Sequence, residues 1–127
     1  MKNWQDHLSE ALVETACRGT TITYRALADR CGVPPPRRIH AVTNALETMI
    51  RADHAAGHAL RAAVAVSRAR NGLPGPGFFQ VCREIGRYFG PDLGPQAELF
   101  HRLECAHTHK TANQDMLPEV FGTDGFD

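Results

Sequence analysis

Residues 20–56 read TTITYRALADRCGVPPPRRIHAVTNALETMIRADHAA, and this stretch decides the expected fold. It begins with a β-branched run, 20–23, that suits one short edge strand. Thr23 is expected to cap a helix over 24–30, because a threonine hydroxyl accepts a hydrogen bond from a free backbone N–H at a helix start. Gly32 and the three prolines that follow it are expected to end this helix.

A second helix in the same stretch has the clearest apolar periodicity of the chain and is expected to run from about Arg37 to about Ala56. A short helix, a turn and a long helix follow one another as in a helix-turn-helix, whose second helix is presented to a partner. The inward face of the second helix is expected to consist of Ile39, Val42, Leu46, Met49, Ile50 and Asp53.

The flanking segments predict an α+β fold that is mostly helical. It would have a winged helix-turn-helix core, a short two- or three-stranded wing and extra C-terminal helices, because two thin strands cannot form a sheet of their own. Residues 1–109 are expected to form one domain, and 110–127 an acidic, loosely ordered tail. The expected elements are a helix over 4–18, a strand over 60–68, a reversal at Asn71-Gly72, a restricted loop over 73–77, a helix over 78–89 that buries Phe89, and a helix over 95–107 that buries Leu99, Phe100, Leu103 and Ala106.

Composition and length are those of an ordinary globular domain. The chain has 127 residues, of which 43% are hydrophobic and 22% are charged. It has no apolar run of transmembrane length, and its N-terminus lacks the apolar segment of a signal peptide, so the expected location is the cytoplasm, with no membrane partner. In that compartment the widely spaced Cys17, Cys31, Cys82 and Cys105 are expected to be reduced thiols.

Charge is distributed unevenly although the formal net charge is zero. The segment 18–87 contains eleven arginines against four acidic residues, a net charge of +7. From Pro91 to the end there are two basic residues against seven acidic ones, a net charge of −5. A basic body with an acidic tail favours a surface that binds a polyanion, and the alternative is a solvated surface whose asymmetry has no function.

Thr23-Tyr24, Ala28, Gly32, Pro34 and Arg38 match, at the same spacing, the pattern TYGxxAxxxGxPxxxRAVG. In these residues the stretch 19–79 resembles the winged-helix DNA-binding domain of O6-alkylguanine-DNA alkyltransferases and alkyltransferase-like proteins. The resemblance implies that Tyr24 crowds a phosphate of the target nucleotide. It also implies that Arg38 enters the base stack in place of a flipped base, a role that suits a planar guanidinium.

Departures from the family pattern limit what the resemblance implies. Arg25 stands where the family has glycine, and Ile39-His40-Ala41 stands where it has AVG. The family's PCHRV segment with its nucleophilic cysteine is absent, because residues 60–68 read LRAAVAVSR. Without that thiolate no alkyl transfer is expected, so the predicted function is non-catalytic binding of duplex DNA, including distorted or modified duplexes. The segment LPGPGFF also resembles small bacterial proteins that combine a TYxxLA helix with a GLPGxGF loop, which implies no activity.

The candidate DNA-binding residues lie mainly on the outer side of the second helix. Arginine pairs with guanine, asparagine pairs with adenine, and a small alanine lets a helix approach the groove. Arginines before and after this helix are expected to hold phosphates. The alternative is a protein-interaction module that uses the same helix face. The predicted DNA-binding residues are Tyr24, Arg25, Arg37, Arg38, His40, Ala41, Asn44, Arg51, Arg68 and Arg70.

Cys82, His101 and Cys105 are the residues with metal-ligand chemistry. His101 and Cys105 are four residues apart and share one helix face, and Cys82 would be a third ligand. The chain has no CxxC pair and no clear fourth ligand, so buried cysteines with surface histidines are favoured over zinc. The glycine-rich loop 72–77 lacks the lysine and hydroxyl residue of a P-loop. No cofactor is therefore expected, and a small metal-dependent enzyme remains the less favoured alternative.

Overall fold

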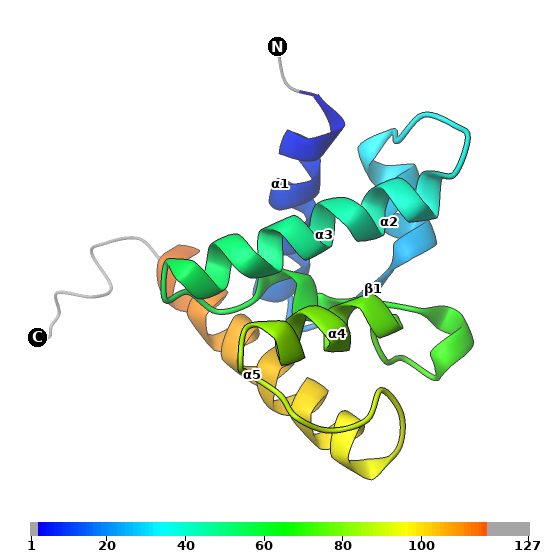
Figure 1. Ribbon diagram of the computed structural model, residues 1–127. Helices are drawn as coiled ribbons and strands as arrows, with labels where there is room; N and C mark the ends of the chain where they lie inside the picture. Colours follow the sequence, from blue (N-terminus) through cyan, green and yellow to red (C-terminus); the bar gives the residue numbers. More distant parts are fainter. Residues whose placement is uncertain (1–2, 117–127) are drawn as a thin grey trace, which may run out of the picture.

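The computed structural model describes residues 3–116, which form a mostly helical fold with one small sheet (Figure 1). This confirms the predicted α+β class in its coarse form. The described elements are α1 (Trp4–Cys17), β1 (Ile22–Thr23), α2 (Tyr24–Cys31), α3 (Arg38–Ala55), the 3₁₀ helix η1 (Arg61–Val64), β2 (Ala65–Val66), the 3₁₀ helix η2 (Arg68–Arg70), α4 (Pro76–Glu84) and α5 (Pro95–Met116).

Local capping explains why the first helices begin and end where they do. Asn3 caps α1 through a reciprocal pair of hydrogen bonds with Asp6. The Thr23 hydroxyl accepts a hydrogen bond from the Ala26 N–H at 3.1 Å, which confirms the predicted cap of α2. Gly32 ends α2 in the left-handed conformation, with a φ of 70° that an L side chain rarely adopts.

The long helix α3 lies within one residue of its predicted limits. Its buried face contains Val42, Leu46, Ile50 and Asp53, as predicted. Ile39 was predicted to face the core and this is wrong, because its side chain is 41% exposed. Ile39 belongs to the first turn of α3, where it lines an open surface groove and not the core.

The two strands pair in parallel, with Ile22 opposite Ala65 and Thr23 opposite Val66. Of the strand predicted over 60–68, only two residues are a strand. The alanine-rich part before them forms the 3₁₀ helix η1. Asn71 and Gly72 reverse the chain with positive φ, as predicted. No further strand follows them in the described part of the chain, where the Ser67 N–H donates to the Leu73 carbonyl across a tight loop.

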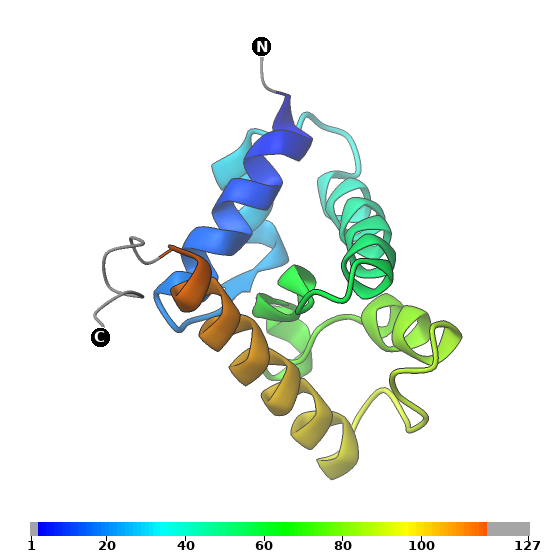
Figure 2. The same ribbon diagram turned by 90° about the vertical axis from the view of Figure 1, so that its left-hand side faces the viewer.

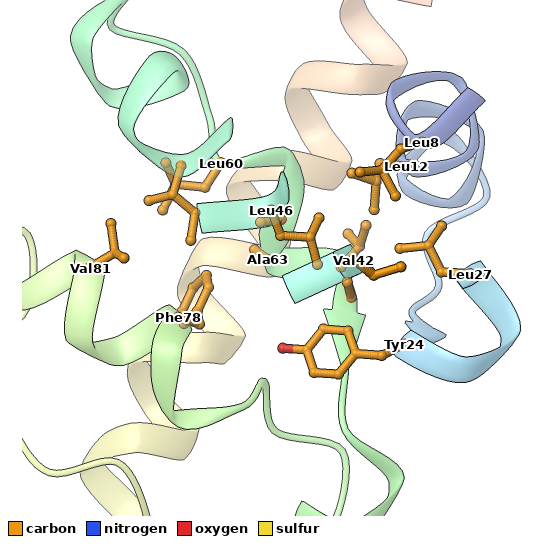
Figure 3. Close-up of a cluster of buried hydrophobic side chains, with 14 of the residues drawn as sticks. Leu8, Leu12, Tyr24, Leu27, Val42, Leu46, Leu60, Ala63, Phe78 and Val81 are labelled. Carbon is orange, nitrogen blue, oxygen red and sulfur yellow. The ribbon is translucent and has the colours of Figure 1, made fainter. Parts of the chain in front are cut away.

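The core surrounds η1, which lies between α1, α3 and α5 (Figure 2). Three of the four residues of η1 are small, and these three, Ala62, Ala63 and Val64, are all buried. Small side chains let three helices approach one short segment closely. The labelled cluster in Figure 3 contains Leu8, Leu12, Leu27, Val42, Leu46, Leu60, Phe78 and Val81 together with Tyr24 and Ala63.

The last helix, α5, presents a different face to the core from the one predicted. It buries Ala97, His101, Cys105 and Thr108, whereas Leu99 and Leu103 are 50% and 60% exposed. The side chains of His101 and Thr108 bond the backbone carbonyls of Ala63 and Leu60, which rotates the smaller and polar side of α5 toward η1. The prediction that Leu99, Leu103 and Ala106 are buried is therefore wrong.

Both helices near the C-terminus also differ from their predicted lengths. The helix α4 ends at Glu84, and Phe89 lies after it with 82% of its side chain exposed, so its predicted burial is wrong. The helix α5 continues to Met116, so the domain boundary predicted after residue 109 falls inside a helix. The remainder of the predicted tail, 117–127, lies outside the described residues. Within 3–116 no helix has the length and apolar character needed to cross a membrane.

Candidate nucleic-acid interface

An open groove with a volume of about 460 Å³ lies where the parallel strands end. Its walls come from the start of α2, the first turn of α3 and the segment 67–69 that enters η2. We call it the arginine groove, because two arginines line it. Its lining residues are Thr23, Tyr24, Arg25, Ala26, Asp29, Ile39, Ser67, Arg68 and Ala69.

The sheet register places the two arginines of this groove side by side. Thr23 and Val66 are partners in the parallel pair, and Arg25 and Arg68 each follow their partner residue by two positions. Parallel strands leave a sheet at the same edge, so the two chain segments emerge together there. Both arginines are exposed and both line the groove, although they are far apart in the sequence.

Most arginines of the basic segment 18–87 are engaged in ion pairs and hydrogen bonds. Within the described residues, Arg25, Arg37 and Arg68 have no such partner, and Arg37 immediately precedes α3. Within the segment 18–87, the positive charge that is free to meet a polyanion is therefore concentrated at the arginine groove and the start of α3. The paired arginines are Arg18 and Arg30 with Glu14, Arg38 with Asp29, Arg51 with Glu84, Arg61 with Asp53, Arg83 with Asp92 and Arg87 with Glu104.

The start of α3 adds backbone N–H groups that have no acceptor within the helix to these charges. No side chain of residues 3–116 caps this helix, and its first turn contains no acidic residue. The first N–H groups of an α-helix have no partner within the helix and carry a partial positive charge, which suits an anion. Arg37 lies at the cap position with a φ of 56°, so a cation and the helix terminus lie together.

Arg38, predicted to enter the base stack, is held against α2 instead. Its Nε donates to the Val33 carbonyl at 2.7 Å, and its Nη2 donates to the Ala28 carbonyl at 3.1 Å. Its Nη1 pairs with the Asp29 carboxylate at 2.7 Å. Two of these contacts are hydrogen bonds to carbonyls near the end of α2. They hold the guanidinium between α2 and the start of α3.

Tyr24, predicted to crowd a phosphate, is buried beneath α3 with 9% of its surface exposed. In Figure 3 its ring lies beside Val42 and its hydroxyl points toward the side of Phe78. The hydroxyl accepts a hydrogen bond from the Gly75 N–H at 2.7 Å. Burial raises the pKa of this phenol above its usual value, with a smaller opposing effect of the Gly75 hydrogen bond.

Some of the other predicted DNA-binding residues are exposed, and the others are half-buried or bonded to other parts of the protein. His40 and Asn44 are exposed and bond each other at 3.2 Å, whereas Ala41 is half-buried and turned toward α1. Arg51 pairs with Glu84 at 2.6 Å. Arg70 donates to the carbonyls of Pro74 and Asp92, so it holds together two loops and does not face the groove.

The three residues predicted as metal-ligand candidates do not form a cluster. Within the described part of the chain, no group of three or more metal-binding side chains converges. His101 and Cys105 do meet, with 3.1 Å between Nε2 and Sγ, but both contact the Ala63 carbonyl. Burial raises the pKa of the Cys105 thiol to about 11 and that of Cys82 to about 12, so neither is a ready thiolate.

One residue of the groove, Ile39, was missed as a candidate contact because its apolar character suggested a core position. Its neighbours along the chain, Arg37 and His40, are exposed. No protein-family model, no curated protein and no solved structure matches the chain.

Proposed function

We propose that the protein binds duplex DNA without catalysing a reaction on it. The observation that supports this most directly is the position of three unpaired arginines: Arg25 and Arg68 line one groove, and Arg37 lies at the start of α3, whose first turn borders that groove. Phosphate contacts supply most of the non-specific affinity of DNA-binding proteins. A row of arginines with a helix terminus provides such contacts.

The proposed contact geometry is that of a winged helix-turn-helix in which the start of α3 meets the duplex. His40 and Asn44 would face the major groove from α3, and Arg25 and Arg68 would contact phosphates on either side. Ile39 takes the place next to the base edges that the family resemblance gives to Arg38. Apolar side chains in the major groove contact the methyl group of thymine, so an isoleucine at this position would favour an A·T pair.

Alkyl transfer is not part of the proposal, because β2 supplies no nucleophile. Its two residues are Ala65 and Val66, both buried. Ser67, the next residue, lines the groove, and no histidine or carboxylate is hydrogen-bonded to its hydroxyl within the described residues. A serine needs an adjacent base to become a nucleophile.

The test is fluorescence anisotropy with a labelled duplex over a series of salt concentrations. If three arginines contact phosphates, the logarithm of the affinity should fall with the logarithm of the salt concentration at a slope of about −2.7. The double variant Arg25→Ala/Arg68→Ala should weaken binding and reduce the magnitude of that slope by about 1.8. Arg18→Ala is the matched control, because Arg18 is exposed but paired with Glu14. The proposal fails if wild type shows no affinity at low salt or if the double variant binds like the control.

A protein-interaction module is the second candidate function, and one surface favours it. A shallow groove of about 530 Å³ runs between α1 and α3, and its lining is mostly apolar. Trp4 and Met49 are both half-buried there. A partner in that groove would be held by apolar contact, so its binding should depend weakly on salt, in contrast to DNA. Its lining residues are Trp4, Gln5, Leu8, Ala41, Asn44, Ala45, Thr48 and Met49.

A further inference from the structure

The outer face of α5 contains an apolar stripe that residues 3–116 leave exposed. Leu99 and Leu103 lie one helical turn apart and are 50% and 60% exposed. The opposite face of the helix, with His101 and Cys105, is buried against η1. Single exposed leucines are common on protein surfaces, but apolar residues that follow one another along a helix mark an interaction site.

Phe89 extends the stripe beyond the helix. Arg87 pairs with Glu104 at 3.1 Å, and a Cβ added to Gly90 would lie 2.6 Å from Cδ of Gln96. The segment 87–90 therefore runs along α5 in the opposite direction to the helix. Phe89 lies between these two contact points with 82% of its side chain exposed, so a large aromatic ring flanks Leu99 and Leu103 on the side of Gln96.

Two opposite charges border the other edge of the stripe. Glu98 and Arg102 are four residues apart, so they lie on the same edge of α5, one turn apart. Neither side chain has a hydrogen bond or ion pair within the described residues. When two such helices pack antiparallel about a two-fold axis with Leu99 against Leu103, Glu98 of each copy faces Arg102 of the other. The edge is therefore complementary to itself.

We propose that the protein forms a homodimer through antiparallel packing of α5 on α5 of a second copy. A two-fold interface uses the same patch on both subunits, and this patch has the required self-complementary charges. Leu99 and Leu103 form its apolar centre, with Phe89 at one border and the two exchanged Glu98–Arg102 pairs at the other. The zero formal net charge of the chain adds no repulsion between copies.

The test uses charge reversal and does not depend on DNA binding. Sedimentation equilibrium of wild type over about 1 µM to about 1 mM should show a monomer–dimer equilibrium. Glu98→Arg and Arg102→Glu should each weaken the dimer at least about tenfold, because like charges then face each other across the axis. An equimolar mixture of the two variants should form a heterodimer, since a wholly basic edge then meets a wholly acidic one.

Leu103→Glu should abolish the dimer while leaving the helical circular dichroism unchanged, because the residue is exposed. Ile39→Glu is the matched control: it places the same charge at an exposed apolar residue on α3 and should leave the dimer intact. A wild type that stays monomeric throughout the concentration range would overturn the proposal. So would a dimer that resists Leu103→Glu, or single charge variants that fail to associate with each other.

Discussion

The guanidinium of Arg38 is bonded to the Asp29 carboxylate and to the carbonyls of Ala28 and Val33, so this side chain fastens the start of α3 to the end of α2. Asp29 is 59% exposed, and an ion pair this open adds little stability. The two carbonyl bonds matter more, because hydrogen bonds from a charged donor are the stronger kind.

Arg38→Ala should therefore lower the free energy of unfolding by about 1–3 kcal/mol, as measured by urea denaturation. Arg38→Lys should recover only part of the loss, because one ammonium cannot reproduce the planar fork that reaches three acceptors. The folded fraction of Arg38→Ala should still bind duplex DNA better than Arg25→Ala/Arg68→Ala. The reverse order would restore the base-stack role that the family resemblance gives to Arg38.

Tyr24 joins the starts of two helices that are distant in the sequence, α2 and α4, because its hydroxyl accepts the hydrogen bond of the Gly75 N–H. Tyr24→Phe keeps the ring and removes the acceptor, which leaves a partly buried N–H without a partner. The expected cost is about 1–3 kcal/mol in the free energy of unfolding. Because the ring lies beneath α3, DNA affinity per folded molecule should not change. A specific loss of affinity without loss of stability would instead support a phosphate-contacting role.

Among the ion pairs of the described residues, Asp53–Arg61 has the least exposed carboxylate, since the Asp53 side chain is 4% exposed. Arg61 donates to both carboxylate oxygens, and the Arg61 backbone N–H adds a further bond. Arg61→Met would leave a buried charge with only the backbone donor, and the loss should be about 3–5 kcal/mol in urea denaturation.

A variant without either charge separates two contributions to the free energy of unfolding: the penalty for an unpaired buried carboxylate and the stabilisation by the ion pair. The double variant Asp53→Asn/Arg61→Met should be more stable than Arg61→Met, although it has one more substitution. Additive losses in this double-mutant cycle would show that the two side chains do not interact.

His101 should make stability depend on pH. Burial lowers the pKa of its imidazole below the usual value, and the Ala63 hydrogen bond opposes this shift less strongly. The unfolded chain then binds a proton that the folded chain does not, so stability should fall as pH decreases from about 6.5 toward the lower folded pKa. The free energy of unfolding measured from pH 7.5 to pH 5 should decrease by up to about 1.4 kcal/mol per pH unit from this group.

His101→Gln is the control for that titration, because glutamine does not take up a proton and its amide can still donate to the Ala63 carbonyl. The variant should show a shallower decrease over the same range. An unchanged pH profile would assign the dependence to the other histidines.

The two helices α2 and α3 could be predicted from the sequence because their determinants are local. Thr23, Gly32 and the prolines after it define the ends of α2 within a few residues, and the period of Val42, Leu46 and Ile50 defines the buried side of α3. Such signals do not depend on the rest of the fold. The same is true of the reversal at Asn71-Gly72.

Features that depend on distant partners could not be predicted in this way. Leu99 and Leu103 look like a core stripe, yet α5 turns His101 and Cys105 inward because carbonyls of η1 are there to receive them. The parallel pairing of β1 with β2 has no local signal either. An arginine can be identified as unpaired only when the positions of the acidic side chains are known. Arg25, Arg37 and Arg68 could therefore not be distinguished from the other predicted DNA-contacting residues by sequence.

The parallel pairing of Thr23 with Val66 also has a thermodynamic consequence. The segment that contains α2 and α3 is a closed loop between the two strands, so Arg25 and Arg68 lie together only when the two strands are paired. An unfolded or half-folded chain would offer a polyanion one wall of the groove at most. By mass action, a ligand held by both walls must raise the unfolding midpoint, and by more as its concentration exceeds the dissociation constant.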